Sequence, residues 1–150
     1  MYFIITLFAL LFINPIAEVT AVKAAADKVE IVIESNDQMR FDLSEITVKE
    51  GDTIVLTLKH VGKLPKAAMG HNWVLLSSGI EMGAFAQKAI QARDNDYIPA
   101  DGEGFIVNTE LIGGGEETTI EFEAPAAGEY TFICSFPGHY ALMNGKFIVE

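Results

Sequence analysis

The chain has 150 residues, half of them hydrophobic, and its 21 acidic and 10 basic residues give a formal net charge of −11 at neutral pH. This length and apolar content suit one compact domain with a substantial core and leave little room for a second domain. The acidic balance argues against nucleic-acid binding, which requires clustered lysine and arginine side chains for phosphate contacts.

The chain begins with an apolar segment. Residues 1–13 are almost all hydrophobic, and small residues that suit cleavage follow at 21–26. This run is short for a membrane span of about 20 residues, so residues 1–24 are predicted to be a secretory signal peptide. An uncleaved anchor is the alternative, because no Lys or Arg precedes the apolar run. Residues 25–150 are then expected to form one domain that is exported to the periplasm.

Short strand signals occupy most of the remaining chain. In residues 28–35, Val29, Ile31 and Ile33 alternate with the residues between them, as expected for a strand. Further strands are expected at 46–49, 54–60, 72–76, 104–109, 118–123, 129–135 and 146–150. Residues 79–93 carry apolar residues at helical spacing and are predicted to form a helical excursion. The pattern predicts an all-β protein, an antiparallel Greek-key β-sandwich or barrel of about eight strands.

A loop near the C-terminus concentrates metal-binding side chains. Cys134, the single cysteine, is followed by His139 and Met143, and Pro-Gly and Asn-Gly turns bend the segment. Far upstream, His71 follows Gly70, whose missing side chain would let its carbonyl oxygen approach an ion. One thiolate, two imidazoles and a weak thioether are the ligands of blue copper electron-transfer sites. The sequence therefore predicts one copper ion bound by these residues.

The surroundings of this site are predicted from neighbouring residues. Asn72 is placed to hydrogen-bond across to the ligand loop and hold the two halves of the site together. Trp73 is predicted to be core, and His60 a structural histidine. The apolar shell that excludes water is expected to contain Met39, Met69, Phe136 and Leu142.

Each candidate ligand, taken alone, could also be an ordinary structural residue. A lone cysteine on a strand is usually a core residue, and single His or Met residues are usually structural. An electron carrier is favoured by the conjunction of Cys134, His139 and Met143 with His71. An enzyme is disfavoured because a catalytic copper needs more histidines than the three present. A copper storage or delivery module without a redox role is the alternative, although such modules carry their ligands on flexible segments.

The same residues resemble the azurins, small blue copper proteins of the cupredoxin family. Residues 134–145 match Cys-x-Phe-Pro-Gly-His-x-Ala-Leu-Met-x-Gly, and residues 64–75 match Leu-Pro-Lys-x-x-Met-Gly-His-Asn-Trp-Val-Leu. The resemblance implies an eight-stranded Greek-key sandwich. It also implies that His71, Cys134 and His139 are equatorial ligands, Met143 a distant axial ligand and the Gly70 carbonyl a second axial contact.

The resemblance further implies how the protein works. It would exchange electrons with redox proteins such as c-type cytochromes or copper and haem reductases, as a monomer and without a substrate at the metal. These partners would dock at an apolar patch near His139, and His60 would correspond to a histidine that responds to pH. The patch maps onto Met39, Val61, Gly62, Leu64 and Ala141.

Two departures from the azurin pattern stand out. Val29 occupies the position of the first cysteine of the usual azurin disulfide, and residues 49–52 are one residue shorter and lack the second cysteine. A cross-link that typically contributes about 2–4 kcal/mol is thus missing, so packing and metal binding must supply the stability. Residues 79–93 match azurins in length but hardly in sequence, which suggests a surface for a different partner.

Overall fold

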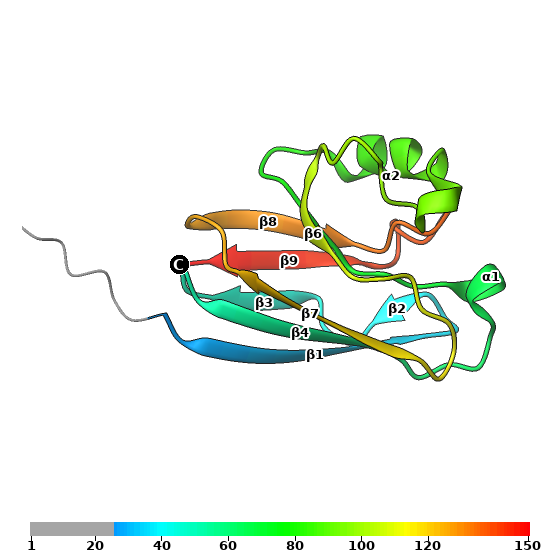
Figure 1. Ribbon diagram of the computed structural model, residues 1–150, viewed down its shortest axis with the longest axis horizontal. Helices are drawn as coiled ribbons and strands as arrows, with labels where there is room; N and C mark the ends of the chain where they lie inside the picture. The colour runs from blue at the N-terminus through cyan, green and yellow to red at the C-terminus, as the bar shows by residue number, and fades with distance from the viewer. Residues whose placement is uncertain (1–25) are drawn as a thin grey trace, which may run out of the picture.

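The computed structural model describes residues 26–150, which fold into two layers of β-sheet with the helices outside them (Figure 1). The expectation of a signal peptide at residues 1–24 lies outside the described residues. The elements in chain order are β1 (Lys28–Asn36), β2 (Arg40–Phe41), β3 (Glu45–Val48), β4 (Thr53–His60), α1 (Lys66–Met69), β5 (Val74–Leu76), α2 (Met82–Ile90), the 3₁₀ turn η1 (Arg93–Asn95), β6 (Phe105–Asn108), β7 (Glu117–Glu123), β8 (Gly128–Ile133) and β9 (Asn144–Val149).

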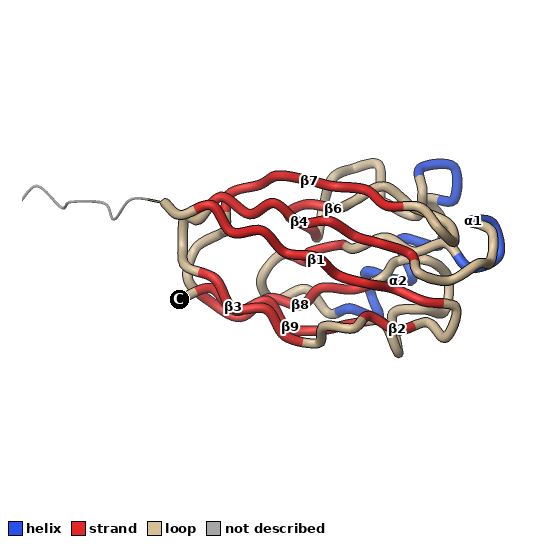
Figure 2. The backbone as a smooth tube through the Cα atoms, turned by 90° about the horizontal axis from the view of Figure 1, so that it is seen from below, coloured by secondary structure: helices blue, strands red, loops and turns tan. Residues whose placement is uncertain are grey.

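The strands form a sandwich rather than a closed barrel. One sheet has the order β2-β1-β4-β7 and the other the order β3-β9-β8-β5-β6. Figure 2 shows β1, β4 and β7 running side by side in the first of these layers. The predicted all-β sandwich with one helical excursion is confirmed, and the described residues add the two-residue strand β2, the short helix α1 and the 3₁₀ turn η1 to it.

The expectation of antiparallel pairing throughout is wrong for two pairs of strands. β1 pairs with β4 in parallel, and β3 pairs with β9 in parallel. Both pairs join strands that are not consecutive in the chain, so no tight hairpin forces them to run in opposite directions. Turn signals between neighbouring segments indicate where strands end, but they carry no information on such distant partners.

Alternation along β4 fixes which side chains enter the sandwich. Ile54, Leu56, Leu58 and His60 point inward and are at most 1% exposed, while the residues between them are partly exposed. Successive side chains of a strand point to opposite faces, which explains this period of two. His60 therefore continues the inward row and brings an imidazole to the end of the core where the ligand loops meet.

The main core is aromatic at its centre. The fully buried Trp73 packs against Phe132, with ring centroids 5.6 Å apart, and against Phe147 at 6.1 Å. The predicted core position of Trp73 is thus confirmed. Val29 packs against this core as a partly buried residue. Cys134 is a free buried thiol. At the position where azurins usually have the first cysteine of a disulfide, this protein has the apolar packing of Val29 instead.

The helical excursion covers the outer face of the five-stranded sheet. Phe85 and Ala89 of α2 pack with Val74 and Leu76 of β5, and β5 is buried on both faces. The helix begins after Glu81, whose carboxylate accepts a hydrogen bond from the Ala84 N–H at 2.7 Å and caps its N-terminus. Among residues 26–150, the helices lack the length and apolar character that are needed to cross a bilayer.

Candidate metal centre

Three donor atoms converge at the end of the sandwich. Nδ1 of His71 lies 3.2 Å from Nδ1 of His139, and the Cys134 sulfur lies 3.9 Å and 3.7 Å from these two atoms. The centre of a triangle with these sides lies about 2.1 Å from each atom. Zinc takes bonds of about 2.0–2.3 Å to imidazole nitrogen and thiolate sulfur. A first-row metal ion therefore fits between the three side chains as they stand.

Different elements bring these ligands together. His71 lies after α1, where its backbone N–H and C=O both bond to Ile112 in an isolated bridge. Cys134 directly follows β8, one residue beyond the strand rather than at its last position. His139 sits in the loop between β8 and β9 after Gly138, whose φ of +82° is a left-handed conformation that favours glycine. The expected bend of this loop is confirmed.

Backbone hydrogen bonds close the C-terminal loop. The Cys134 N–H donates to the Met143 carbonyl at 2.9 Å, and the Met143 N–H donates to the His139 carbonyl at 2.8 Å. Met143 is fully buried. The loop therefore places the thioether residue beside the cysteine and histidine, as the spacing suggests, whereas its role as an axial ligand stays a prediction.

Gly70 lies where its carbonyl can approach the same point. Its oxygen is 4.0 Å from the Cys134 sulfur. A Cβ atom at this position would lie 2.6 Å from the Lys66 carbonyl oxygen, closer than real Cβ contacts allow. Glycine is thus required by the close approach of α1, and its assignment as a second axial contact stays a prediction.

A hydrogen bond on the side of the ring away from the cluster sets the orientation of His71. Its Nε2 lies 2.9 Å from the Asn36 carbonyl oxygen, which can only accept, so Nε2 carries the proton and Nδ1 faces the cluster with its lone pair. Asn36 was not singled out from the sequence, because a backbone carbonyl acts regardless of side-chain identity. The end of β1 thus selects the nitrogen of His71 that is free for a metal.

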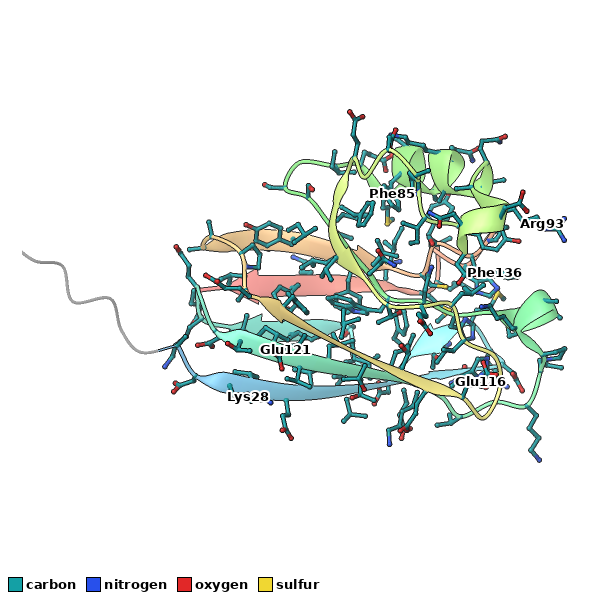
Figure 3. All side chains as sticks on the ribbon, viewed as in Figure 1. Lys28, Phe85, Arg93, Glu116, Glu121 and Phe136 are labelled. Carbon is teal, nitrogen blue, oxygen red and sulfur yellow. The ribbon has the colours of Figure 1, made fainter. Side chains whose placement is uncertain are left out.

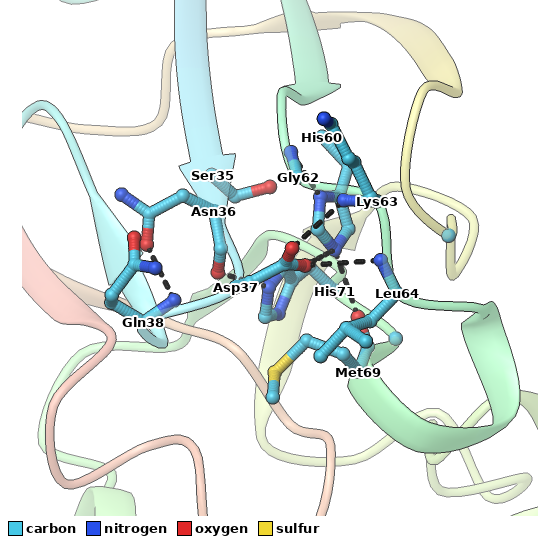
Figure 4. A network of polar contacts seen from close by, with 12 residues as sticks. Ser35, Asn36, Asp37, Gln38, His60, Gly62, Lys63, Leu64, Met69 and His71 are labelled. Carbon is cyan, nitrogen blue, oxygen red and sulfur yellow. Dashed lines mark hydrogen bonds and ion pairs between the residues drawn. The ribbon is translucent and has the colours of Figure 1, made fainter.

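His60 supports this ligand without joining the cluster. Its ring stacks on that of His71 with centroids 4.4 Å apart. Its Nε2 is 2.9 Å from the Met69 carbonyl, and its Nδ1 accepts from the Gly62 N–H at 3.0 Å (Figure 4). Both ring nitrogens are engaged, so the structural interpretation of His60 is confirmed. The response to pH that the azurin resemblance implies for His60 stays a prediction.

Asn72 joins the two ligand segments as predicted. Its side-chain carbonyl accepts from the Ser135 N–H at 2.9 Å, and its amide donates to the Ser135 hydroxyl oxygen at 2.8 Å. The same amide reaches the Asp96 carbonyl at 3.2 Å, and the Ser135 hydroxyl donates to the Tyr97 carbonyl at 2.8 Å. Asp96 and Tyr97 both have positive φ. This network extends to the segment after α2, a contact that sequence reasoning missed.

Burial sets the protonation of the three donors. It lowers the pKa of His71 and His139 to about 4, since desolvation disfavours a charged imidazolium, and it raises the pKa of the Cys134 thiol to about 12. At neutral pH the imidazoles are therefore neutral and ready to coordinate. The thiol loses its proton when a metal ion binds, because a cation stabilises the thiolate.

Large apolar side chains are exposed on loops that adjoin the candidate ligands in the chain. His139 retains 4% of its surface exposed, whereas His71, Cys134 and Met143 retain none. Val61, Leu64 and Leu142 are 56%, 41% and 51% exposed. Leu142 therefore belongs to this surface and not to the buried shell, which corrects its expected place. Met39 and Gly62 are partly buried and Ala141 is exposed. That these residues form a docking patch stays a prediction.

The sandwich and its buried cluster of two imidazoles and one thiol define a class of protein, the small β-sandwich metalloproteins with a single N,N,S site. Comparison with known proteins agrees. Residues 27–150 match the model of copper binding proteins of the plastocyanin/azurin family. Azurin-1 of Alcaligenes xylosoxydans xylosoxydans is 46% identical over 117 residues, which cover 75% of this chain and 91% of that protein.

Two further proteins extend the comparison. Outer membrane protein H.8 of Neisseria meningitidis serogroup B is 44% identical over 117 residues, and the match covers 76% of this chain and 63% of that protein's length. The structure of auracyanin A, a "blue" copper protein from Chloroflexus aurantiacus, superposes with a TM-score of 0.75 at 36% identity and covers 82% of this chain and 99% of that chain. The chain belongs to the plastocyanin/azurin family of copper-binding proteins, and its metal is copper.

Proposed function

We propose that this protein carries single electrons between redox partners at one copper site. The observation that carries the proposal is the buried triangle of His71 Nδ1, His139 Nδ1 and Cys134 Sγ, whose spacing fits a metal ion without rearrangement. We assign these three residues as equatorial ligands, with Met143 and the Gly70 carbonyl as weak axial donors. Bound copper supplies a one-electron couple, Cu(II)/Cu(I).

The protein's contribution is to hold the ligands still and keep water away. His71 is fixed by the Asn36 carbonyl, and the loop from Cys134 to Met143 is closed by its own backbone bonds. Ligands that barely move between oxidation states lower the reorganisation that accompanies each transfer. A buried thiolate and buried neutral imidazoles also leave no open position for a substrate, which favours a carrier over an enzyme.

Electron exchange would take place at His139, the ligand with exposed surface. The surrounding patch of Val61, Leu64 and Leu142 offers an apolar contact for redox proteins such as c-type cytochromes or copper and haem reductases. We propose that the protein acts as a monomer in the periplasm, after removal of residues 1–24.

The test is spectroscopic. Cu(II) added to the purified protein should produce an intense visible band of thiolate-to-copper charge transfer, and Cys134→Ser should abolish it. The band should bleach on reduction and return on reoxidation over repeated cycles. A colourless wild-type complex would refute the electron-carrier assignment, and a complex that releases its copper on reduction would instead support the storage or delivery alternative.

A further inference from the structure

A hollow lies on the flank of the metal centre, where Phe136 lines it and contacts His139. It has a volume of about 330 Å³, at the lower end of the range of about 300–1,000 Å³ that is typical of small-ligand sites. The hollow is lined by Lys66, Ala67, Arg93, Tyr97, Leu111 and Phe136. Apolar and aromatic groups with a few charged groups at the edge are the usual composition of such sites.

The floor of this lateral hollow touches the metal centre. The ring of Phe136 lies 4.6 Å from that of His139, centroid to centroid, and Tyr97 packs edge-on against Phe136 at 5.1 Å. Leu111 borders Gly70, where a Cβ atom would lie 3.0 Å from a Leu111 methyl carbon. A ring that rests on Phe136 would therefore be separated from a copper ligand by one aromatic side chain.

The edge of the lateral hollow is cationic in a protein of net charge −11. Lys66 is held by the Asp96 carboxylate at 3.3 Å. Arg93 is exposed and, within residues 26–150, forms no salt bridge to an acidic side chain. Figure 3 shows Arg93 at the same end of the molecule as Phe136, reaching outward. An unpaired guanidinium beside aromatic rings suits a planar anion, which it can hold by charge and by stacking.

We propose that the lateral hollow binds a planar aromatic anion, a sulfonated or carboxylated hydroquinone, and accepts its electrons through Phe136 and His139. This inference rests on the proposed electron-carrier function. Each hydroquinone gives one electron to each of two oxidised protein molecules in turn, and it releases two protons to solvent as it becomes the quinone. Arg93 binds the sulfonate or carboxylate, and Phe136 contacts the ring.

The experiment uses two reagents that differ by one sulfonate group, 2,5-dihydroxybenzenesulfonate and plain hydroquinone, and compares the protein variants with each reagent separately. Stopped-flow absorption follows reduction of the oxidised copper protein in wild type, Arg93→Gln and Lys28→Gln. Lys28 is a matched control, because it is also exposed and cationic but lies at the opposite end of the sandwich (Figure 3). The two variants have the same net charge, so a general electrostatic effect would be equal in both.

We expect the rate with the sulfonated reagent to saturate with concentration and to fall about fivefold at low reagent concentration in Arg93→Gln, as for loss of one exposed charge contact. Plain hydroquinone should change by less than about twofold in both variants, and about 1 M salt should abolish the effect of the sulfonate. Equal rates in Arg93→Gln and Lys28→Gln with the sulfonated reagent would overturn the proposal.

Binding is also measured without electron transfer. The sulfonated hydroquinone does not react with the copper(I) protein, so amide NMR shifts on titration report contact alone. Shifts should concentrate at residues 93–97, 111 and 136, and in Arg93→Gln they should require about fivefold more reagent. Shifts centred instead on Leu64 and Leu142 would refute the lateral site. A missing visible band would refute the electron-carrier function, whereas these shifts would still report on binding in the hollow.

Discussion

Replacement of Asn72 by alanine tests how the two ligand-bearing segments are held together. The Asn72 side chain is fully buried. It accepts from the Ser135 N–H at 2.9 Å, and it donates to the Ser135 hydroxyl at 2.8 Å and to the Asp96 carbonyl at 3.2 Å. Truncation to alanine removes these three bonds and leaves the Ser135 N–H buried without a partner.

The cost follows from what is left unsatisfied. A buried donor without a partner, here the Ser135 N–H, costs about 1–3 kcal/mol. Each further hydrogen bond that the Asn72 side chain loses removes about 0.5–1.5 kcal/mol. The Ser135 hydroxyl keeps its bond to the Tyr97 carbonyl at 2.8 Å, which limits the loss. We therefore expect the free energy of unfolding of Asn72→Ala to fall by about 2–4 kcal/mol.

Urea unfolding of the metal-free protein measures this change. Thr57→Ala is the matched control, because it removes an exposed hydroxyl contact of 2.8 Å to Thr119 and should cost at most about 0.5–1 kcal/mol. Ser135→Ala retains the backbone N–H bond to Asn72 and should cost less than Asn72→Ala. A loss in Asn72→Ala no larger than that of Thr57→Ala would refute the reasoning that this network joins the two segments.

Four further outcomes are expected. Copper binding at pH 7 should release about one proton per ion, because burial raises the pKa of Cys134 to about 12 and keeps its thiol protonated before the metal binds. His71 and His139 release none, since their pKa values are lowered to about 4 and both are already neutral. Calorimetry in buffers of different ionisation heat measures the number of protons released, and release of no proton would contradict the expectation. The folded pKa values of His71 and His139 lie below the unfolded value of about 6.5, so the unfolded chain binds more protons. The metal-free protein should therefore lose stability as pH falls from about 6.5 to about 4. The free energy of unfolding should change less steeply with pH in His139→Asn, and an unchanged slope would count against the burial argument. Gly70→Ala should lower the free energy of unfolding by about 1–3 kcal/mol by overpacking and shift the visible band, whereas wild-type stability in urea would show that α1 can move aside. Leu64→Glu should slow electron exchange with a redox partner while leaving the visible band intact, and an unchanged exchange rate would remove the patch from the docking surface.

The fold could be predicted from local patterns because its strands are locally encoded. The inward row of β4 follows from the alternation of Ile54, Leu56 and Leu58, and the same parity places His60 inside. The parallel pairing of β1 with β4 could not be predicted this way, because two strands lie between them in the chain, β2 in the same sheet and β3 in the other. Pairing over such distances depends on which apolar faces pack together.

The metal centre likewise has features that local sequence predicts and features that it does not. The ten residues from Cys134 to Met143 bring three ligand types into one loop, and their chemistry alone indicates copper. The bend at Gly138 is also local, because positive φ favours glycine there. The sequence could not show that the Asn36 carbonyl sets which nitrogen of His71 faces the cluster, because a backbone carbonyl acts whatever the side chain is. Nor could it show that Leu142 lies on the surface, because leucine occurs in cores and on surfaces alike.

By itself, the sequence determined the candidate ligands, the strand-rich architecture and the lack of a second cysteine for a disulfide, because these depend on residue identity and short-range spacing. Only the tertiary structure decided the distances of 3.2–3.9 Å within the cluster. It also decided the network from Asn72 through Ser135 to Tyr97 and the place of Arg93 beside Phe136 in the lateral hollow. These features join residues that are far apart in the chain, and the packing of the two sheets and the excursion after β5 sets them.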